Sequence, residues 1–262
     1  MRHASLPMYD ADPVSVGGWW QAIAELLRAE GVAGVPQAIA WPDDLEAHWH
    51  EPDLLLSQTC GYPLVTRLFD VVQVVGAFRY TAPGASGIQY RSALVTRVGD
   101  AGRRLQDYRG RRVALNALDS YSGWHALRAS LAAHGGAAGF FGEEVLCGSH
   151  RASLAAVQTG RADIAAIDCI TLAGLRLHAP HLLERLATIG HTDAAPGLPL
   201  VTSRHTSPAD VAALRRALDT ASRDPVLADI RKALFIGGFV AASSSAWERI
   251  RKSGAPAGRV PG

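Results

Sequence analysis

Short apolar segments alternate with amphipathic helical patterns along most of this chain of 262 residues. Between the first two of these segments, Trp20, Ile23 and Leu27 share one helical face, which ends at Gly31. This alternation predicts an α/β fold with mostly parallel strands. The predicted strands are Ala4–Met8, Gln37–Ala40, Asp53–Ser57, Val71–Phe78, Gln89–Thr96, Arg112–Asn116, Glu144–Cys147, Asp163–Ile167 and Leu198–Thr202.

The C-terminal part of the chain carries helix-start signals instead of strand patterns. Ser207-Pro208 and Asp224-Pro225 each place a capping residue before a proline, and Ser245 with Glu248 has the spacing of a capping box. The sequence therefore predicts helices alone after the strand that ends at Thr202.

Two extended stretches, near residues 89–96 and 198–202, bracket a complete set of strand–helix units. A chain that leaves one lobe, builds a second and then returns has this order of elements. We therefore expect residues 1–92 and 198–262 to form a discontinuous first lobe, and residues 93–197 to form an inserted second lobe. A cleft between two such lobes is a common place for a small-molecule site.

Composition excludes several classes of function. The 26 Lys and Arg residues nearly balance the 24 Asp and Glu residues, so the net charge of +2 gives no basic surface for nucleic acid. The three cysteines are too few and too widely spaced for a disulfide framework or a paired-cysteine zinc site, and we expect them to be small buried residues. No apolar run approaches the roughly 20 residues of a membrane span. The first residues lack the apolar core of a secretory signal, so the chain as written would stay in the cytoplasm unless a leader has been removed.

The segment Asp119-Ser-Tyr-Ser-Gly123 lies between a predicted strand and a helix. The first backbone N–H groups of a helix have no partner within it, so they attract anions, and the hydroxyls of Ser120 and Ser122 add donors. This pattern is typical of an oxyanion site. The alternative is that one serine simply caps the helix.

Two further strand ends carry polar side chains. Ser149 and His150 stand at the start of the next helix, where both can donate hydrogen bonds to an anion. Asp168 ends an apolar strand and either accepts a hydrogen bond from a protonated ligand oxygen or caps the following helix. Because ligands of open α/β sheets bind beyond the carboxyl ends of the strands, the three segments together indicate one site.

The first lobe has a counterpart in Ser57-Gln-Thr59 and Tyr62, which follow another predicted strand. Tyr9 follows the first strand, and Tyr90 lies on a presumed connecting strand. Each of these two tyrosines either closes over a ligand or packs in the core with its hydroxyl at the edge. We expect Trp19 and Trp20 to be core residues.

Several segments in this order resemble the phosphate, phosphite and phosphonate substrate-binding proteins of ABC transporters, in the type 2 periplasmic binding protein superfamily. The resemblance covers nearly the whole chain. The segments that carry it are Ala4-Ser-Leu-Pro-Met-Tyr-Asp10, Asp53-Leu-Leu-Leu-Ser-Gln-Thr-Cys-Gly-Tyr-Pro-Leu64, Tyr90-Arg-Ser92, Arg109-Gly-Arg-Arg-Val-Ala114, Asp119-Ser-Tyr-Ser-Gly123, Gly148-Ser-His150, Ala165-Ala-Ile-Asp168 and Ala195-Pro-Gly-Leu-Pro-Leu200.

The resemblance implies two three-layer α/β lobes, joined by two hinge strands, that close around a small phosphorus oxyanion and deliver it to an ABC permease. The resemblance also implies a periplasmic location, and we expect a monomer without cofactor or metal. Its ligand-binding residues here would be Ser120, Ser122, Gly123, Ser149, His150, Asp168, Tyr90, Tyr62 and Tyr9.

Three other functions remain as alternatives. A cytoplasmic sensor of small anions would use the same fold. An enzyme on this fold would need a catalytic motif, and the nucleophile-elbow, phosphate-loop and zinc-protease spacings are all missing. The close histidine pairs His48/His50 and His178/His181 have no third ligand nearby in the sequence, and we expect them at the surface. A transcriptional effector domain would need a helix-turn-helix ahead of the first strand.

Overall fold

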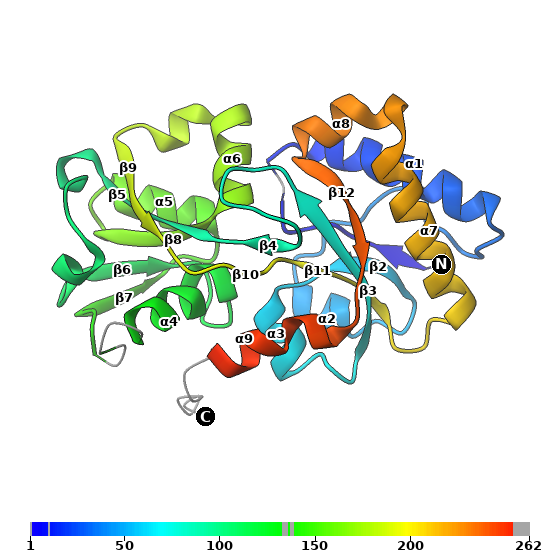
Figure 1. Cartoon of the computed structure of the whole chain (residues 1–262), viewed down its shortest axis with the longest axis horizontal. Coiled ribbons are helices and arrows are strands. Elements are labelled where there is room, and N and C mark those ends of the chain that lie inside the picture. The colour runs from blue at the N-terminus through cyan, green and yellow to red at the C-terminus, as the bar shows by residue number, and fades with distance from the viewer. Residues whose placement is uncertain (1, 10, 133–135, 137–138, 254–262) are drawn as a thin grey trace. The chain divides into compact units, whose positions relative to one another are not determined.

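The computed structural model describes residues 2–9, 11–132, 136 and 139–253 (Figure 1). These residues fold into two compact units. Unit 1 consists of Met1–Gln89 and Pro196–Glu248, and unit 2 consists of Tyr90–Ala195 with the residues of the last helix from Arg249 on. The lobe boundaries at 92/93 and 197/198 stay predictions.

Unit 1 is built on a mixed sheet of five strands in the order β1-β2-β11-β3-β12. β2 runs parallel to β1, whereas β11 is antiparallel to both β2 and β3, and β12 is antiparallel to β3. Its strands are β1 (His3–Ala4), β2 (Leu54–Gln58), β3 (Val72–Tyr80), β11 (Pro199–Ser203) and β12 (Ile236–Ala241). Its helices are α1 (Pro13–Ala29), α2 (Leu45–Trp49), α3 (Gly61–Thr66), α7 (Pro208–Arg223), η5 (Pro225–Leu227), α8 (Ala228–Ala233), η6 (Ser244–Trp247) and the start of α9 (Glu248–Ser253).

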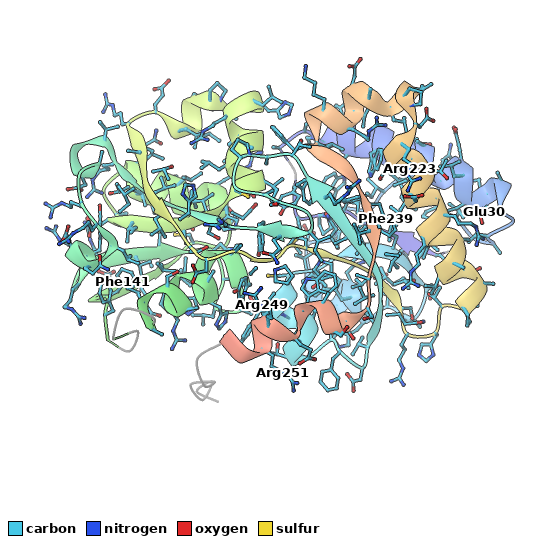
Figure 2. The ribbon with its side chains drawn as sticks, in the orientation of Figure 1. Glu30, Phe141, Arg223, Phe239, Arg249 and Arg251 are labelled. Carbon is cyan, nitrogen blue, oxygen red and sulfur yellow. The ribbon has the colours of Figure 1, made fainter. Side chains whose placement is uncertain are left out.

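The core of unit 1 lies between this sheet and helices α1, α7 and α8. Trp19 and Trp20 are completely buried in it, which confirms their assignment to the core. Phe239 of β12, labelled in Figure 2, lies on this sheet. Its ring packs edge-on against the ring of Phe78 of β3, with 6.4 Å between the ring centroids. Burial of such large side chains contributes about 1.5–3 kcal/mol each, so this face is a main source of the unit's stability.

Unit 2 is built on a second mixed sheet, in the order β7-β6-β8-β5-β9. The three strands β7, β6 and β8 are parallel, while β5 is antiparallel to β8 and β9. The strands are β5 (Ser92–Arg97), β6 (Arg112–Leu115), β7 (Glu143–Leu146), β8 (Ile164–Asp168) and β9 (Leu186–His191). The helices are η1 (Val98–Asp100), η2 (Leu105–Tyr108), η3 (Tyr121–His125), α4 (Ala126–Ala132), α5 (His150–Gln158), α6 (Cys169–His178) and η4 (Pro180–Leu183).

Both faces of the sheet in unit 2 are covered by helices. Successive side chains of a strand point to opposite faces. In β8, Ala165 and Ile167 therefore join a core with helices α5 and α6, whereas Ile164 and Ala166 join a second core on the other face. That second core contains Trp124 and the buried leucines of α4. The unit thus has the three layers that the resemblance implies.

The predicted strand Gln89–Thr96 is interrupted at Arg91. Its first part, β4 (Gln89–Tyr90), pairs with β10 (Ala195–Pro196) in a separate two-stranded sheet, at the places where the chain passes between the two units. Its second part is β5. Next to the short sheet, the N–H of Gly197 donates to the carbonyl of Ile88 at 2.7 Å.

Several predictions about the strands are wrong. Gln37–Ala40 is an irregular segment, tied by a hydrogen bond from the N–H of Ala40 to the carbonyl of Ala4. The sheets are mixed instead of mostly parallel, because the strands next to the two crossings between units run back against their neighbours. The C-terminal part is not wholly helical, since it contains β12. Ser245 is inside a 3-10 helix whose N-cap is Ser243, so it caps nothing.

Candidate ligand-binding site

The loop after β6 leads into a continuous helical segment, η3 followed by α4. Ser120 is its N-cap: the N–H of Gly123 donates to Ser120 Oγ at 3.1 Å, and the N–H groups of Trp124 and His125 donate to the carbonyl of Ser120. The capping alternative is therefore what the structure shows for Ser120. This cap uses the N–H of Gly123 as a donor to Ser120 Oγ, while the hydroxyl hydrogen of Ser120 stays available to a ligand.

Ser122 meets His150 across the carboxyl ends of β6 and β7. Ser122 Oγ lies 3.1 Å from Nε2 of His150, and the same nitrogen lies 3.3 Å from Oδ2 of Asp168 at the end of β8. Because β6, β7 and β8 are parallel, their carboxyl ends share one edge of the sheet, as the sequence predicts. The structure brings these three predicted residues into one cluster.

Geometry assigns the proton of His150 to Nε2. If Nε2 carried no proton, its lone pair would point at a lone pair of the Asp168 carboxylate, which is repulsive. A protonated Nε2 instead donates a hydrogen bond to that carboxylate. Ser122 then keeps its own hydroxyl hydrogen, which it can donate to a ligand. Burial lowers the pKa of His150 from its ordinary value, and the nearby Asp168 carboxylate offsets part of that effect.

Asp168 is also the N-cap of α6. Its Oδ1 accepts from the N–H groups of Ile170 (3.0 Å) and Thr171 (2.9 Å), and its Oδ2 accepts from the hydroxyl of Thr171. The carboxylate is therefore held rigidly and already accepts several hydrogen bonds. Ser149 has a comparable local role, because it caps α5 through a hydrogen bond from the N–H of Ala152 to its Oγ, and it is exposed.

Sequence reasoning missed three residues of this cluster. Ser92 of β5 donates from Oγ to the carbonyl of Ser122 at 2.9 Å and so holds that serine in place. Thr171 supports Asp168, and its position three residues after an aspartate at a helix start was a usable signal. Asn116 follows β6 directly, and its Oδ1 lies where a side chain at Gly123 would be.

The predicted residues of unit 1 have a different setting. Ser57 is completely buried and bonds through Oγ to Nε2 of His48 at 3.2 Å. The expectation that His48 lies at the surface is therefore wrong, because α2 packs against β2 and buries this side chain between them. His50 is exposed as expected.

Gln58, the residue after Ser57, donates from Nε2 to the hydroxyl of Tyr80 at 3.1 Å. The ring of Tyr80 packs edge-on against the ring of Tyr9, with 5.4 Å between the ring centroids. Tyr9 and Tyr62 are both half-buried. Tyr90, by contrast, is buried in β4 and belongs to unit 2.

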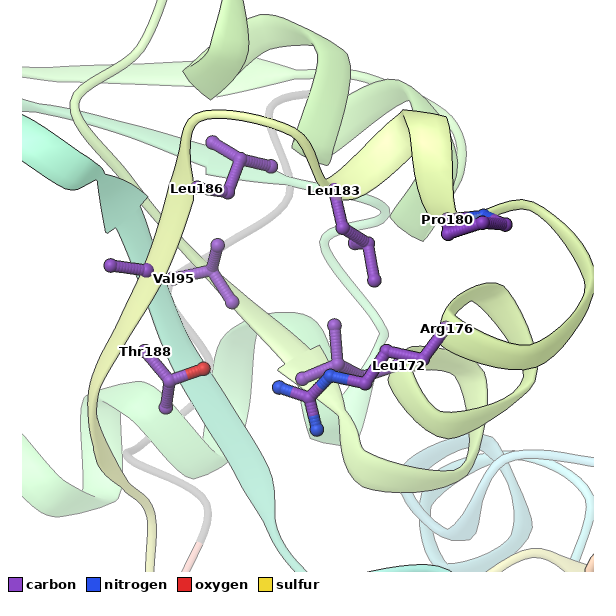
Figure 3. Close-up of a pocket in the computed structure, with 8 residues that line it drawn as sticks. Val95, Leu172, Arg176, Pro180, Leu183, Leu186 and Thr188 are labelled. Carbon is purple, nitrogen blue, oxygen red and sulfur yellow. The ribbon is translucent and has the colours of Figure 1, made fainter.

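A separate hollow of unit 2, of about 200 Å³, lies among α6, η4 and β9 (Figure 3). None of its lining residues belongs to the predicted site. They are Val95, Leu172, Arg176, Pro180, Leu183, Leu186, Ala187 and Thr188.

Free cysteine thiols are present in both units, whereas the described residues contain no cluster of potential metal ligands. No group of three or more histidine, cysteine or acidic side chains among them is arranged to hold a metal ion. The three cysteines are free thiols. Cys169 is buried as expected, whereas Cys60 and Cys147 are half-buried.

Residues 20–247 match the family model described as the periplasmic phosphonate substrate-binding protein of ABC transporters. The chain belongs to this family. It is therefore a substrate-binding protein by family, which confirms the resemblance and the predicted solute-binding role. No curated protein matches the chain.

Solved structures of low sequence identity share the fold of this substrate-binding protein. PhnD1 from Prochlorococcus marinus, in complex with methylphosphonate, has a TM-score of 0.75 at 14% identity, over 97% of this chain and 96% of that one. A binding protein component of an ABC phosphonate transporter from Pseudomonas aeruginosa has a TM-score of 0.74 at 15% identity, over 96% and 85%. XAC2383 from Xanthomonas citri, bound to ATP, has a TM-score of 0.69 at 16% identity, over 97% and 98%. These matches confirm the two-lobed α/β binding-protein fold.

Among the residues that the structure describes, no helix combines the length and the apolar character that crossing a membrane requires.

Proposed function

We propose that this protein binds a small phosphorus oxyanion at the carboxyl ends of β6, β7 and β8, and passes it to an ABC permease. Ser120, Ser122 and His150 are the proposed donors. The observation that carries the proposal is the cluster in which Ser122 and Asp168 both approach Nε2 of His150. Family membership supports the same class of ligand.

The cluster offers donors and one acceptor to a partly protonated anion. Ser120 and Ser122 each keep a hydroxyl hydrogen that can point at an anionic oxygen. When an anion enters, Nε2–H of His150 turns from Asp168 to the anion, and the P–OH proton of the ligand replaces it on Asp168. Hydrogen bonds to a charged group contribute about 1.5–3 kcal/mol each, so three such donors contribute about 4.5–9 kcal/mol, which corresponds to a Kd between about 0.5 mM and 0.3 μM.

The same geometry argues against serine catalysis at this place. In a catalytic triad the acid holds Nδ1 of the histidine, and Nε2 takes the proton of the serine. Here Asp168 and Ser122 compete for the same nitrogen, which already carries a proton. In unit 1, Glu51, His48 and Ser57 do follow the order of a triad, but Ser57 is completely buried and out of reach of a substrate.

A thermal-unfolding series with inorganic phosphate, phosphite, methylphosphonate, sulfate and small carboxylates tests the proposal. Ligand at about 100 Kd adds about 2.7 kcal/mol of stability, which raises Tm by about 5–10 °C. We expect this shift with at least one phosphorus anion and not with sulfate, which has no proton for Asp168. No shift with any phosphorus anion, or a shift with a carboxylate alone, would overturn the proposed ligand class.

Asp168→Asn tests how the site rejects sulfate. The amide carries no charge to repel a fully deprotonated anion, so we expect sulfate to raise the Tm of this variant. Glu144→Gln is the matched control, because it removes one negative charge from an exposed position of β7. If sulfate still fails to stabilise Asp168→Asn while phosphate does, Asp168 does not discriminate between the anions.

A further inference from the structure

The side-chain amide of Asn116 contains one of the buried polar atoms of unit 2 that have no hydrogen-bond partner among the described residues. Its Oδ1 is buried and has no partner among the residues that the structure describes. The residue as a whole is half-buried. Buried polar groups in folded proteins nearly always have a partner, and an exception calls for an explanation.

Gly123 makes room for this amide. A Cβ atom built on Gly123 would lie 1.7 Å from Oδ1 of Asn116 and 3.2 Å from Oγ of Ser120. The Asn116 side chain therefore fills the space that any larger residue at 123 would need. Its oxygen faces the Cα of Gly123, whose hydrogen atoms are weak donors that suit an oxygen better than an NH₂ group.

This contact fixes the direction of the amide. With Oδ1 against Gly123, the two hydrogens of Nδ2 point away from that glycine. An aliphatic side chain would fill the same space without burying an unpaired oxygen. A role in packing alone therefore does not account for an asparagine at this position.

We propose that Asn116 is a further anion-binding residue, whose Nδ2 donates to an oxygen of the same ligand that Ser120 and Ser122 hold. This inference rests on the proposed function. The amide adds a neutral donor at the end of β6, the strand between β7, which His150 follows, and β8, which ends in Asp168. It also gives Gly123 a second function, because the absence of a side chain there is what admits the amide.

Calorimetric titration with inorganic phosphate and with methylphosphonate tests the assignment. Asn116→Leu keeps the branching at Cγ and loses both donors, so we expect affinity to fall about tenfold. Asn116→Asp keeps the shape but presents a carboxylate to the anion, and we expect a loss of about a hundredfold that shrinks as salt is added. Gln106→Glu is the matched control for charge, because it adds the same charge at an exposed position ahead of β6, at the other end of that strand.

A structural role predicts a different result. In that case both Asn116 variants would lower the Tm of the ligand-free protein, and the loss of affinity would not depend on salt. We expect instead that the affinity loss of Asn116→Asp shrinks as salt is added, whatever the Tm of the ligand-free variants, because the methyl groups of leucine are larger than the amide atoms they replace and can lower Tm by themselves. If a variant fails to fold, the NMR resonance of the Asn116 side-chain amide in wild-type protein provides the test, because direct contact with an anion changes its chemical shift.

Failure of this inference is distinguishable from failure of the proposed function. Wild-type protein that binds no phosphorus anion overturns both. Wild-type binding that neither Asn116 variant weakens, or an Asn116 amide resonance that does not move on saturation, overturns the role of Asn116 alone.

Discussion

A serine and a histidine meet at a strand end in each of the two units, but the pair in unit 2 is less completely buried. In unit 1, Ser57 and His48 are 0% and 3% exposed, and their hydrogen bond is sealed beneath α2. In unit 2, the His150 side chain is 13% exposed, and Ser122 shares that histidine with Asp168. The same residue pair therefore stabilises the fold in one unit and forms a candidate anion site in the other. Burial, and not residue type, separates the two roles.

The largest effect is expected on ligand affinity, and it distinguishes the two serines of unit 2 from Ser57 of unit 1. Replacing Ser120 and Ser122 together with alanine removes two donors to a charged ligand, so affinity for a phosphorus oxyanion should fall about a thousandfold. Ser57→Ala should leave that affinity within about twofold, because its hydroxyl already bonds His48. Calorimetric titration of both variants measures the difference. Equal losses in the two would break the comparison.

Acid should destabilise the folded protein through a histidine next to the candidate site. His125 is buried, and its Nε2 donates to the carbonyl of Leu118 at 3.0 Å. Burial lowers the pKa of His125 to about 4, from an ordinary value of 6.5. Between these two values the unfolded chain binds more protons than the folded one, so stability decreases as the pH falls from 6.5 to 4. The total loss from this group is roughly 3 kcal/mol.

Urea unfolding at pH 7, 5.5 and 4.5 measures this loss, with His125→Gln as the comparison. We expect the free energy of unfolding of the variant to depend less steeply on pH over this range, whatever its value at pH 7. An unchanged slope would mean that His125 is not the group responsible. His48 of unit 1, whose pKa burial also lowers while Glu51 opposes the change, would be the next to test.

The smallest expected effect is on stability alone. Ser57→Ala leaves the buried Nε2 of His48 without a partner, which should lower the free energy of unfolding by about 2 kcal/mol. Ser122→Ala leaves His150 bonded to Asp168, so its cost should stay below about 1 kcal/mol. Urea unfolding of the two single variants at pH 7 provides the test. A larger cost for Ser122→Ala would show that the unit 2 cluster is needed for folding as well.

Much of the candidate site was predictable because its signals are local. Ser120, Ser149 and Asp168 each stand between a strand and a helix, and capping chemistry favours these residue types there. Once the strands are taken as parallel neighbours, their carboxyl ends share an edge. The same local signals do not show whether a serine caps, binds or does both, and Ser120 shows that a cap can still have a free hydroxyl hydrogen.

The missed residues have partners far away in the chain. Ser92 bonds to Ser122 thirty positions later, and nothing near Ser92 in the sequence indicates that contact. β12 was missed because Gly237 and Gly238 interrupt the alternation of its apolar residues. The predicted direction of the strands was wrong for a similar reason. A strand has the same local sequence pattern whichever way its neighbour runs, and only the crossings between units set that direction.

The sequence by itself determined the α/β class, the family and the strand ends that carry polar side chains, because these follow from local periodicity, capping and motif order. Only the tertiary structure decided that His48 is sealed while His150 stays partly exposed, that Asp168 and Ser122 share one nitrogen, and that Asn116 lies against Gly123. Exposure and side-chain contact depend on which elements pack over a residue. That packing is a sum of long-range interactions, which no short segment of the chain contains.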